Sequence, residues 1–461
     1  MSVIYKTTPP GHSKQRFPGP GRFIPMRELQ ALRRSPLHAL LHATAQYGDL
    51  FQYPVGFWTI YVVNHPSYIQ HILQDNQRNY SKDTFQYNLL GLAAGDGLLS
   101  SDGPRWLRQR RLAQPAFHRE RIASFCDLMV DATLHMVARW DDVARRGAAF
   151  DIDAEMMRLA LEIVGKALFQ IDLSDRAHTL VHSVLTALEH IIARGLNPFA
   201  LPLRVPTPGN LQFRRAIHTV DHAIYQLIAE RRRENADRGD LLSMLLARDE
   251  ASGESMTDQQ IRDEIITFLI AGHETVASAL TWTWYLLAQH PEVEQKLHQE
   301  LASVLGGHAP RMPDLLGLRY TSMVVDEAMR LYPPGWLMTR RALVEDEIGG
   351  YHIPAGALIV ISQYAAHRHT AYWPEPERFD PERFAPERAA TRPRYAFFPF
   401  GGGAHLCIGN QFALMEARIV VATVAQHVRL RLMAGNAVEV SPLVTLRPKH
   451  GLYMRPERLK R

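Results

Sequence analysis

Apolar positions recur at helical spacing over much of the chain. Between about residues 104 and 305 they fall three and four positions apart, which predicts a succession of amphipathic helices. Residues 66–76 show the same period and predict a shorter helix. Alternation of apolar and polar positions instead favours strands, and it occurs at 50–63, 351–361 and 428–454. The pattern therefore predicts a mainly α-helical protein with small β-sheets.

The connections between these elements give no sign of a division into several domains. Residues 80–101 mix glycine with aromatic residues and predict loops. Prolines gather at 198–208, where they indicate a connection within one domain. Residues 1–35 predict an extended leader with a short helix. Without a long linker, a repeat or a low-complexity block, residues 36–461 are expected to form a single large domain.

Composition narrows the class of protein. The chain has 461 residues, of which 46% are hydrophobic and 21% charged, and this balance is typical of a soluble globular protein. Its two cysteines are far apart, so no disulfide framework is expected and a reducing cytoplasm fits. The proline-containing N-terminus has no apolar segment of anchor length, which predicts no transmembrane anchor.

The net charge of +5 and the pI of about 9.1 make the protein basic. A basic protein can bind nucleic acid, an anionic membrane or an acidic protein. The sequence has no zinc finger, RNA-binding motif or basic tail, so nucleic acid is not an expected partner.

One helix is predicted to be unusually long. Thr257 and Gln260 form a capping-box pattern at its start, and Pro291 ends it after about 34 residues, or roughly 50 Å. Apolar residues 265–270 precede Ala271-Gly272-His273-Glu274-Thr275. The segment is long enough to cross a membrane, but a histidine and a glutamate near its centre would be costly there. A membrane span is therefore not expected, and a plain core helix with a solvent-facing polar patch is the remaining alternative to a functional role.

Cys407 carries the clearest chemical signal. It follows three glycines in Phe400-Gly401-Gly402-Gly403-Ala404-His405-Leu406-Cys407-Ile408-Gly409 and precedes a predicted helix. Glycine permits a close backbone approach, and the positive end of a helix dipole favours a thiolate. The segment therefore suits a sulfur anion held against a planar group such as haem.

Other roles for Cys407 fit the sequence less well. A lone cysteine is commonly a small buried hydrophobe. A structural zinc site needs about four ligands, and the other cysteine is Cys126. A phosphate-binding loop needs an arginine soon after the cysteine, whereas the next one is Arg418. No Cys-x-x-Cys-His motif for covalent haem attachment occurs.

The cysteine segment resembles the signature Phe-x-x-Gly-x-Arg/His-x-Cys-x-Gly of the cytochrome P-450 family. Phe400, Gly403, His405, Cys407 and Gly409 fill its fixed positions. The resemblance implies the cytochrome P-450 fold around one haem b, with Cys407 as the iron ligand and Gly401 in the same loop. Arginine is the commoner residue where this chain has His405, so the charge of that haem-propionate contact would depend on pH.

Two further segments resemble family motifs. Ala271-Gly272-x-Glu274-Thr275 matches the oxygen-binding motif, in which small residues leave room above the haem. There the threonine hydroxyl can turn from its own helix to bound O2, and the carboxylate can relay protons. Glu327 and Arg330 share a helix face that ends in a double proline. Their expected third partner is Arg383, in the second of two Pro-Glu-Arg-Phe sequences.

The haem propionates need cationic or N–H donors. Trp106 and Arg110 lie four positions apart on one predicted helix face and match the Trp-x-x-x-Arg pattern that the family uses for this purpose. The alternative is an arginine-rich amphipathic helix, because several arginines surround this pair. Arg340 occupies another propionate position, although its neighbour Arg341 leaves the assignment open by one residue.

The resemblance implies a monooxygenase that uses O2. About 54 residues follow Cys407 (461 − 407), too few for a fused reductase, so ferredoxin or flavodoxin with its reductase is the expected electron source for this monomer. Apolar and aromatic residues at 84–99 (including Phe85, Tyr87, Leu89 and Leu90), at 196–199 and just after Pro334 predict a lipophilic small-molecule substrate. Fatty acid, terpenoid, steroid and polyketide all stay open.

Two other functions stay open at this point. Peroxide-using or isomerase members of the family typically replace the Glu/Asp–Thr pair, which this chain keeps at Glu274 and Thr275. A non-enzymatic haem sensor would usually carry a second effector domain, and the sequence pattern shows none.

Overall fold

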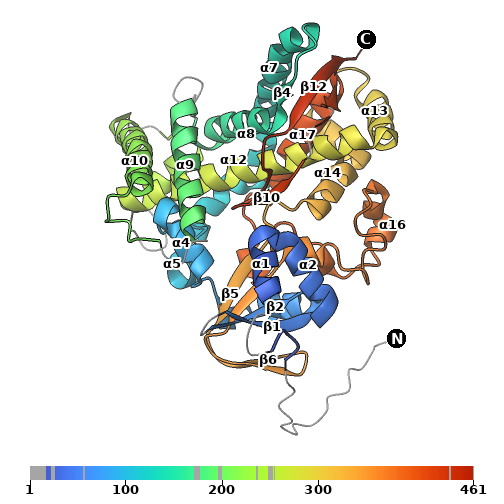
Figure 1. Cartoon of the computed structure of the whole chain (residues 1–461). Helices are drawn as coiled ribbons and strands as arrows, with labels where there is room; N and C mark the ends of the chain where they lie inside the picture. The colour runs from blue at the N-terminus through green and yellow to red at the C-terminus, as the bar shows by residue number, and fades with distance from the viewer. Residues whose placement is uncertain are drawn as a thin grey trace.

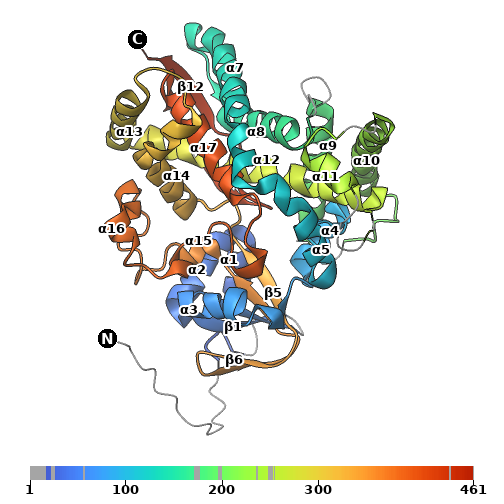
Figure 2. The ribbon, with the colours of Figure 1, turned by 180° about the vertical axis from the view of Figure 1, so that it is seen from behind.

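The computed structural model describes residues 17–21, 26–55, 58–170, 177–195, 200–234, 237–247, 253, 255–433, 435 and 438–459. Figures 1 and 2 show a helical part at one end and a smaller part with the first strands at the other. This arrangement confirms the expected mainly α-helical protein with small sheets. The leader predicted at 1–35 falls partly outside the described residues, and its expected short helix is α1.

Helices account for most of the described elements. Their bounds are α1 Met26–Arg34, α2 Pro36–Tyr47, α3 Pro66–Gln70, α4 Phe85–Ala94, α5 Gly103–Ala113, α6 Arg119–Ser124, α7 Cys126–Arg145, α8 Ile152–Phe169, α9 Ala177–Gly195, α10 Pro208–Glu234, α11 Leu241–Leu246, α12 Asp258–Gln289, α13 Pro291–Leu305, α14 Arg319–Leu331, α15 Gln363–Ala366, α16 Pro386–Ala389 and α17 Asn410–Ala425. A π-helical turn, His71–Asp75, continues α3, so the helix predicted at 66–76 is present.

The described strands form four small sheets. Their bounds are β1 Leu50–Val55, β2 Trp58–Val63, β3 Tyr80–Ser81, β4 Phe150–Asp151, β5 Met338–Ala342, β6 Asp346–Ile348, β7 Tyr351–Ile353, β8 Leu358–Ile361, β9 Val428–Leu432, β10 Val440–Pro442, β11 Leu446–Pro448 and β12 Tyr453–Arg458. The largest has the order β1-β2-β8-β5-β3, in which β2 and β8 run parallel. The strands predicted at 50–63, 351–361 and 428–454 are therefore confirmed.

The loops predicted for residues 80–101 were wrong in part, because α4 occupies the middle of this range. Thr84 precedes the helix in extended conformation, and Gly95, at φ +71°, ends it. Ala93 and Ala94 are fully buried, and Leu89 and Leu90 pack against an apolar cluster that contains residues of α8, α9 and α12. Tertiary packing therefore stabilises a helix that the glycine-rich local sequence does not predict.

The long helix α12 runs through the middle of the molecule (Figure 1). Thr257 Oγ1 accepts from the N–H of Gln260 at 3.2 Å, and Gln260 Oε1 accepts from the N–H of Thr257 at 3.0 Å, so the predicted capping box is present. Among the described helices α12 alone is long and apolar enough to span a membrane, but 83% of its most apolar window is buried inside the protein. It is a core helix.

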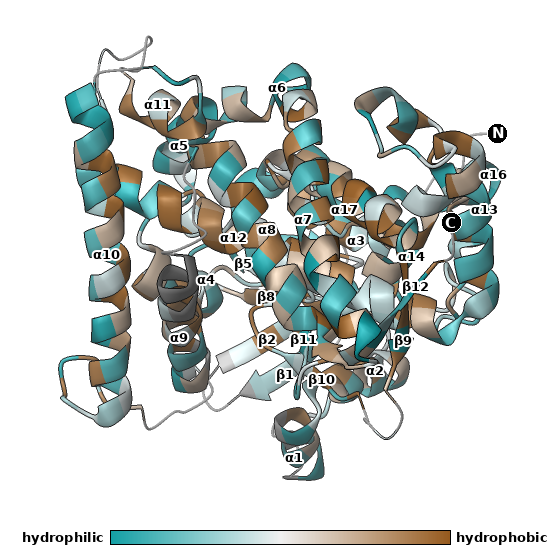
Figure 3. Ribbon diagram, turned by 90° about the horizontal axis from the view of Figure 1, so that it is seen from above, coloured by the Kyte–Doolittle hydropathy of each residue, from teal (hydrophilic) through white to brown (hydrophobic). Residues whose placement is uncertain are grey.

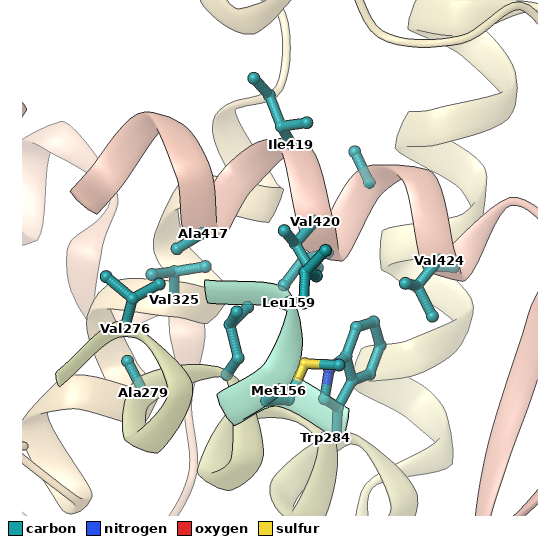
Figure 4. Close-up of a cluster of buried hydrophobic side chains, with 14 of the residues drawn as sticks. Met156, Leu159, Val276, Ala279, Trp284, Val325, Ala417, Ile419, Val420 and Val424 are labelled. Carbon is teal, nitrogen blue, oxygen red and sulfur yellow. The ribbon is translucent and has the colours of Figure 1, made fainter. Parts of the chain in front are cut away.

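Helix amphipathicity explains where each helix lies. The peripheral helix α10 shows hydrophilic and hydrophobic residues in alternation, whereas the visible part of α12 at the centre is mostly hydrophobic (Figure 3). The largest apolar cluster joins α7, α8, α12, α14 and α17, and Figure 4 shows Met156, Leu159, Trp284 and Val420 meeting within it. Apolar burial around α12 thus fixes the helix against which the functional cavity is built.

A buried ion pair fastens α14 to the segment that leads to the cysteine loop. The guanidinium of Arg330 donates to both carboxylate oxygens of Glu327, at 2.6 and 2.8 Å, and both side chains are fully buried. Arg383 Nε lies 3.4 Å from Glu327 Oε1, as expected for the second Pro-Glu-Arg-Phe sequence. Arg330 also donates to the carbonyls of His367, Pro376 and Arg378, so it organises the chain across residues 367–378.

Replacing Arg330 with Met should therefore destabilise the fold strongly. The carboxylate of Glu327 would lose its main partner while staying buried, which costs about 3–5 kcal/mol of unfolding free energy. Chemical denaturation measures this loss. The control is Lys296→Met, which removes the exposed pair with Glu382 at 3.0 Å and should cost less than about 1 kcal/mol. Similar losses in the two variants would contradict a structural role for the buried pair.

Candidate functional site

A cavity of about 320 Å³ lies between α12 and the loop that contains Cys407. Its wall is formed by residues from α4, α5, α8, α12, α17, the segment 334–340 and the cysteine loop, which we define as residues 399–409. Most of the cavity surface is apolar, and a few side chains supply its polar groups. A largely apolar cavity with a few converging polar groups is the usual form of a small-molecule site.

The glycines shape the cysteine loop through close packing. Gly403 has φ +65°, and a Cβ atom there would lie 1.6 Å from the carbonyl oxygen of Leu73 in the π-helical turn. A Cβ at Gly402 would lie 2.5 Å from the ring of Tyr395. A side chain at position 403 would therefore have to move the backbone, and one at position 402 would have to displace the Tyr395 ring. The N–H of Cys407 donates to the carbonyl of Phe400 at 3.0 Å and closes the loop just before α17.

The Cys407 thiol lies deep in the protein but is accessible from the cavity. Burial raises the pKa of this thiol, while the backbone N–H of Gly409 and the charge of Arg110 act in the opposite direction. The position before α17 was expected to favour the thiolate, yet desolvation outweighs that effect in the protein alone. A metal cation bound to the sulfur would reverse the balance, because a coordinating thiol is deprotonated.

The facing wall of the cavity is one side of α12. Ala271, Gly272 and Thr275 all line it, as the motif predicts. Thr275 Oγ1 donates to the carbonyl of Ala271 at 2.6 Å, which is the helix hydrogen bond that this hydroxyl would exchange for a ligand. A Cβ at Gly272 would lie 2.7 Å from Val164 Cγ2 in α8. Gly272 is therefore also required for the close packing of two helices.

Glu274 does not line the cavity, although it adjoins Thr275 in the sequence. Its side chain points to the segment before β11, where Oε1 accepts a hydrogen bond from Thr445 Oγ1 at 3.2 Å. Neighbours in an α-helix point about 100° apart, so both residues cannot face the same space. The expected proton-relay carboxylate thus lies beside the cavity wall on another face of α12.

One end of the cavity is cationic. Trp106, Arg110, Arg340 and His405 all line it, so the structure brings the predicted propionate-binding residues together. Arg110 Nη1 donates to the carbonyl of Leu406 at 2.9 Å, and Arg340 Nη1 donates to Tyr87 Oη at 3.0 Å. Arg341 instead donates to the carbonyl of Asp83 at 2.6 Å and does not line the cavity. Geometry therefore favours Arg340 over its neighbour.

His405 is held between a ring and a carboxylate. Its ring centroid lies 4.2 Å from that of Trp106, and its Nε2 lies 3.3 Å from Asp102 Oδ1 at the N-cap of α5. Burial lowers the pKa of His405, and Asp102 opposes that decrease. The orientation of this histidine therefore depends on a residue that the sequence motif does not include.

Lys82 is a cavity residue that the sequence analysis missed. It is 4% exposed, and its ammonium group donates to the carbonyls of Leu98 and Leu99, both at 3.1 Å. Burial, aided by the nearby charge of Arg340, lowers its pKa to about 7. A single lysine between a two-residue strand and a short helix carries no periodic or motif signal, so only the fold could reveal it.

These features fit haem b. Arg110 and Arg340 direct two cationic groups to one end of the cavity, with Lys82, which is partly protonated near pH 7, and His405 beside them. Two propionates would supply the anionic partners that such a surplus of positive charge requires. The apolar walls on either side suit a flat macrocycle, and the accessible sulfur of Cys407 suits its iron.

The segments predicted to contact the substrate reach the cavity only in part. Tyr87, Leu98, Leu99 and Pro334 line the cavity, together with Met338. Phe85 is 55% exposed and points elsewhere. Leu89 and Leu90 are absent from the cavity wall, because they pack against the cluster that stabilises α4. The segment 196–199 lies outside the described residues.

Comparison with known proteins agrees with this geometry. The family model described as "Cytochrome P450" matches residues 18–457. Cyclooctatin synthase of Streptomyces melanosporofaciens is 37% identical over 90% of this chain and 90% of its own length. The same organism's cyclooctat-9-en-7-ol 5-monooxygenase is 36% identical over 94% and 93% of the two chains. Pentalenene oxygenase of Streptomyces avermitilis is 34% identical over 92% and 93%.

The chain therefore belongs to the cytochrome P450 family, whose members use a haem iron cofactor. Matches over nearly the whole chain, to relatives named as monooxygenases and oxygenases, also show the type of enzyme. It is a cytochrome P450 monooxygenase.

Replacing Arg340 with Met should weaken haem retention by roughly tenfold or more, because a hydrogen bond to a charged group contributes about 1.5–3 kcal/mol. Transfer of haem to an excess of a competing haem-binding protein measures this affinity. The matched control is Arg341→Met, which removes the adjacent arginine outside the cavity and should change retention little. Equal losses in both variants, or a larger loss in the control, would show that Arg340 is not a propionate partner.

Proposed function

We propose that this protein hydroxylates a cyclic terpenoid in the cavity between Cys407 and the α12 face that carries Thr275. The observation that carries the proposal is this single cavity, in which the accessible cysteine sulfur and the Thr275 hydroxyl lie on facing walls. Relatives at about 35% identity that act on terpenoids support the substrate class. Fatty acids, steroids and polyketides are the competing substrates.

Different residues of the chain would have different roles in the reaction. Cys407 would bind the iron, and Phe400, Gly401 and Gly409 would shape the loop around the sulfur. Trp106, Arg110, Arg340 and His405 would hold the propionates, and we add Lys82 to this group. When bound, the haem supplies activation of O2 and the transfer of one oxygen atom to carbon.

The α12 residues would handle the protons. Ala271 and Gly272 leave space next to the cavity, and Thr275 Oγ1 can exchange its bond to the Ala271 carbonyl for one to a bound ligand. Glu274 would supply a proton from the neighbouring helix face. Burial raises the pKa of Glu274 to about 6, which places its titration near neutral pH, where a general acid works best.

The electrons would come from a separate ferredoxin or flavodoxin with its reductase. Arg110 connects α5 to the cysteine loop, so the helix that carries Arg105, Arg108 and Arg111 lies beside that loop. A basic surface there would attract an acidic electron carrier. An unchanged reduction rate at high salt would rule out such electrostatic docking. We place the protein in the cytoplasm and expect it to act as a monomer.

A peroxide-driven reaction is the second candidate for the oxygen source. It would make electrons from a partner, and a proton relay through Glu274 and Thr275, unnecessary. The presence of Glu274 and Thr275 together favours the O2-dependent reaction, because a peroxide already carries its two electrons and protons. Turnover with peroxide alone, faster than turnover with NAD(P)H and the partner proteins, would reverse this preference.

The central experiment is turnover of a panel of cyclic terpenoids, fatty acids and steroids with ferredoxin and its reductase. We expect hydroxylated product from terpenoids and a lower yield of product per electron, by roughly tenfold or more, in Thr275→Ala. The matched control is Thr283→Ala. Thr283 Oγ1 also donates to the carbonyl four residues earlier in α12, that of Ala279, at 2.7 Å, but Thr283 does not line the cavity. Product from the other classes alone would contradict the substrate proposal, and an equal loss in the control would contradict the role of Thr275.

A further inference from the structure

A polar seam lies on the side of α12 that faces away from the cavity. We use this name for five residues, which come from three elements: Asp153, Glu274, Thr281, Thr445 and Arg447. The cavity face of α12 carries residues 271, 275 and 279, whereas residues 274, 278, 281 and 282 lie on the other face. One helix thus separates the reaction space from a buried charged cluster.

The β10–β11 hairpin is fastened to α12 along this seam. Ser278 Oγ and Trp282 Nε1 both donate to the carbonyl of Leu446, at 2.6 and 2.9 Å. One residue earlier, Thr445 donates to Glu274. One residue later, Arg447 forms an ion pair with Asp153 of α8. Three consecutive hairpin residues therefore hold the hairpin against α12 and α8, and the first of them contacts the Glu274 carboxyl group.

The seam reaches from the interior toward solvent. The Glu274 residue is 4% exposed, and its Oε2 has no hydrogen-bond partner among the residues that the structure describes, so one oxygen is free to carry a proton. The side chain of Asp153 is 7% exposed and that of Arg447 is 17% exposed. Asp153 also accepts from Thr281 Oγ1 at 3.2 Å. The contact between Glu274 and Thr445 thus lies in the interior, and the neighbouring pair of Asp153 and Arg447 reaches closer to solvent at Arg447.

We propose that Arg447 and Asp153 are positioning residues for Glu274, and that the balance of their charges sets the pH range in which Glu274 releases a proton toward Thr275. This inference rests on the proposed function, in which Glu274 and Thr275 deliver protons to the cavity. Neither Arg447 nor Asp153 lines the cavity, so both would act only through Glu274.

The charges around Glu274 make opposite contributions. Arg447 favours the ionised carboxylate, as does the hydrogen bond from Thr445, whereas Asp153 disfavours it. The other titratable groups that face Glu274 or Arg447 are Asp151 at the N-cap of α8, Glu189 of α9 and the adjacent His273. Burial lowers the pKa of His273 to about 4, so this ring is neutral at pH 7 and adds no charge.

Two substitutions should therefore shift the titration of Glu274 in opposite directions. In Arg447→Gln the ionised carboxylate loses its positive neighbour, so its pKa should rise by about one unit or more. In Asp153→Asn it loses a negative neighbour, and Arg447 is released from its partner, so the pKa should fall. A role limited to holding the hairpin would not produce shifts of opposite sign.

Difference infrared spectroscopy reads this titration without turnover. The carbonyl stretch of protonated Glu274 is identified by its loss in Glu274→Gln, and its intensity is followed against pH in the haem-loaded protein. The pH profile of product formed per electron should shift in the same directions, because that yield falls as Glu274 ionises. The infrared shifts would remain if the substrate or electron donor were misassigned, so the two proposals can fail separately.

Controls separate this effect from instability. Arg431→Gln removes an arginine that is also in an ion pair, with Glu294 and Glu457, but in β9, and it should leave the Glu274 titration unchanged. Thr445→Val keeps both ions and removes only a hydrogen bond to Glu274, so it should raise the pKa by less than Arg447→Gln does. Asp153→Asn tests the proposal if Arg447→Gln does not fold. Shifts of the same sign in Arg447→Gln and Asp153→Asn, or an unchanged titration in Asp153→Asn, would overturn the proposal.

Discussion

The site depends on one constraint: the single long helix α12 must place its side chains in several different environments at once. α12 contributes to the largest apolar cluster, forms one wall of the cavity and supports the β10–β11 hairpin on another face. Because successive residues of a helix point about 100° apart, Thr275 and Glu274 lie in different surroundings although they are adjacent. The close approach of α8 at Gly272 keeps this helix fixed. The helix α12 thereby connects Thr275 at the cavity to Glu274 in the polar seam.

The cysteine loop, which forms the second wall of the cavity, is also fixed by buried contacts. The buried pair of Glu327 and Arg330 organises the chain before the cysteine loop, and Gly402 and Gly403 let that loop pack directly on its neighbours. Cys407 therefore occupies a position set by backbone packing. The cationic end of the cavity then favours a ligand that is anionic at one edge and apolar elsewhere, which is the character of haem b.

Local patterns predicted the parts of this site that depend on spacing along the chain. The cysteine loop, the capping box of α12 and the pair of Trp106 and Arg110 all follow from residues a few positions apart. The helix α4 was missed because packing against distant helices stabilises it. The sequence also did not predict the roles of Lys82, Arg447 and Asp153. The role of each depends on contacts with residues more than ten positions away in the sequence. Such partners are brought together only by the tertiary fold.

The proposed site works only if Cys407 binds the haem iron as a thiolate. The absorption spectrum of the dithionite-reduced protein with carbon monoxide tests this directly. We predict a strongly red-shifted Soret band in the wild type and in Cys126→Ala, which removes the other cysteine, and its absence in Cys407→Ala. A conventional Soret position in the wild type, or a red-shifted band that persists in Cys407→Ala, would contradict the assignment of Cys407 and the site built around it.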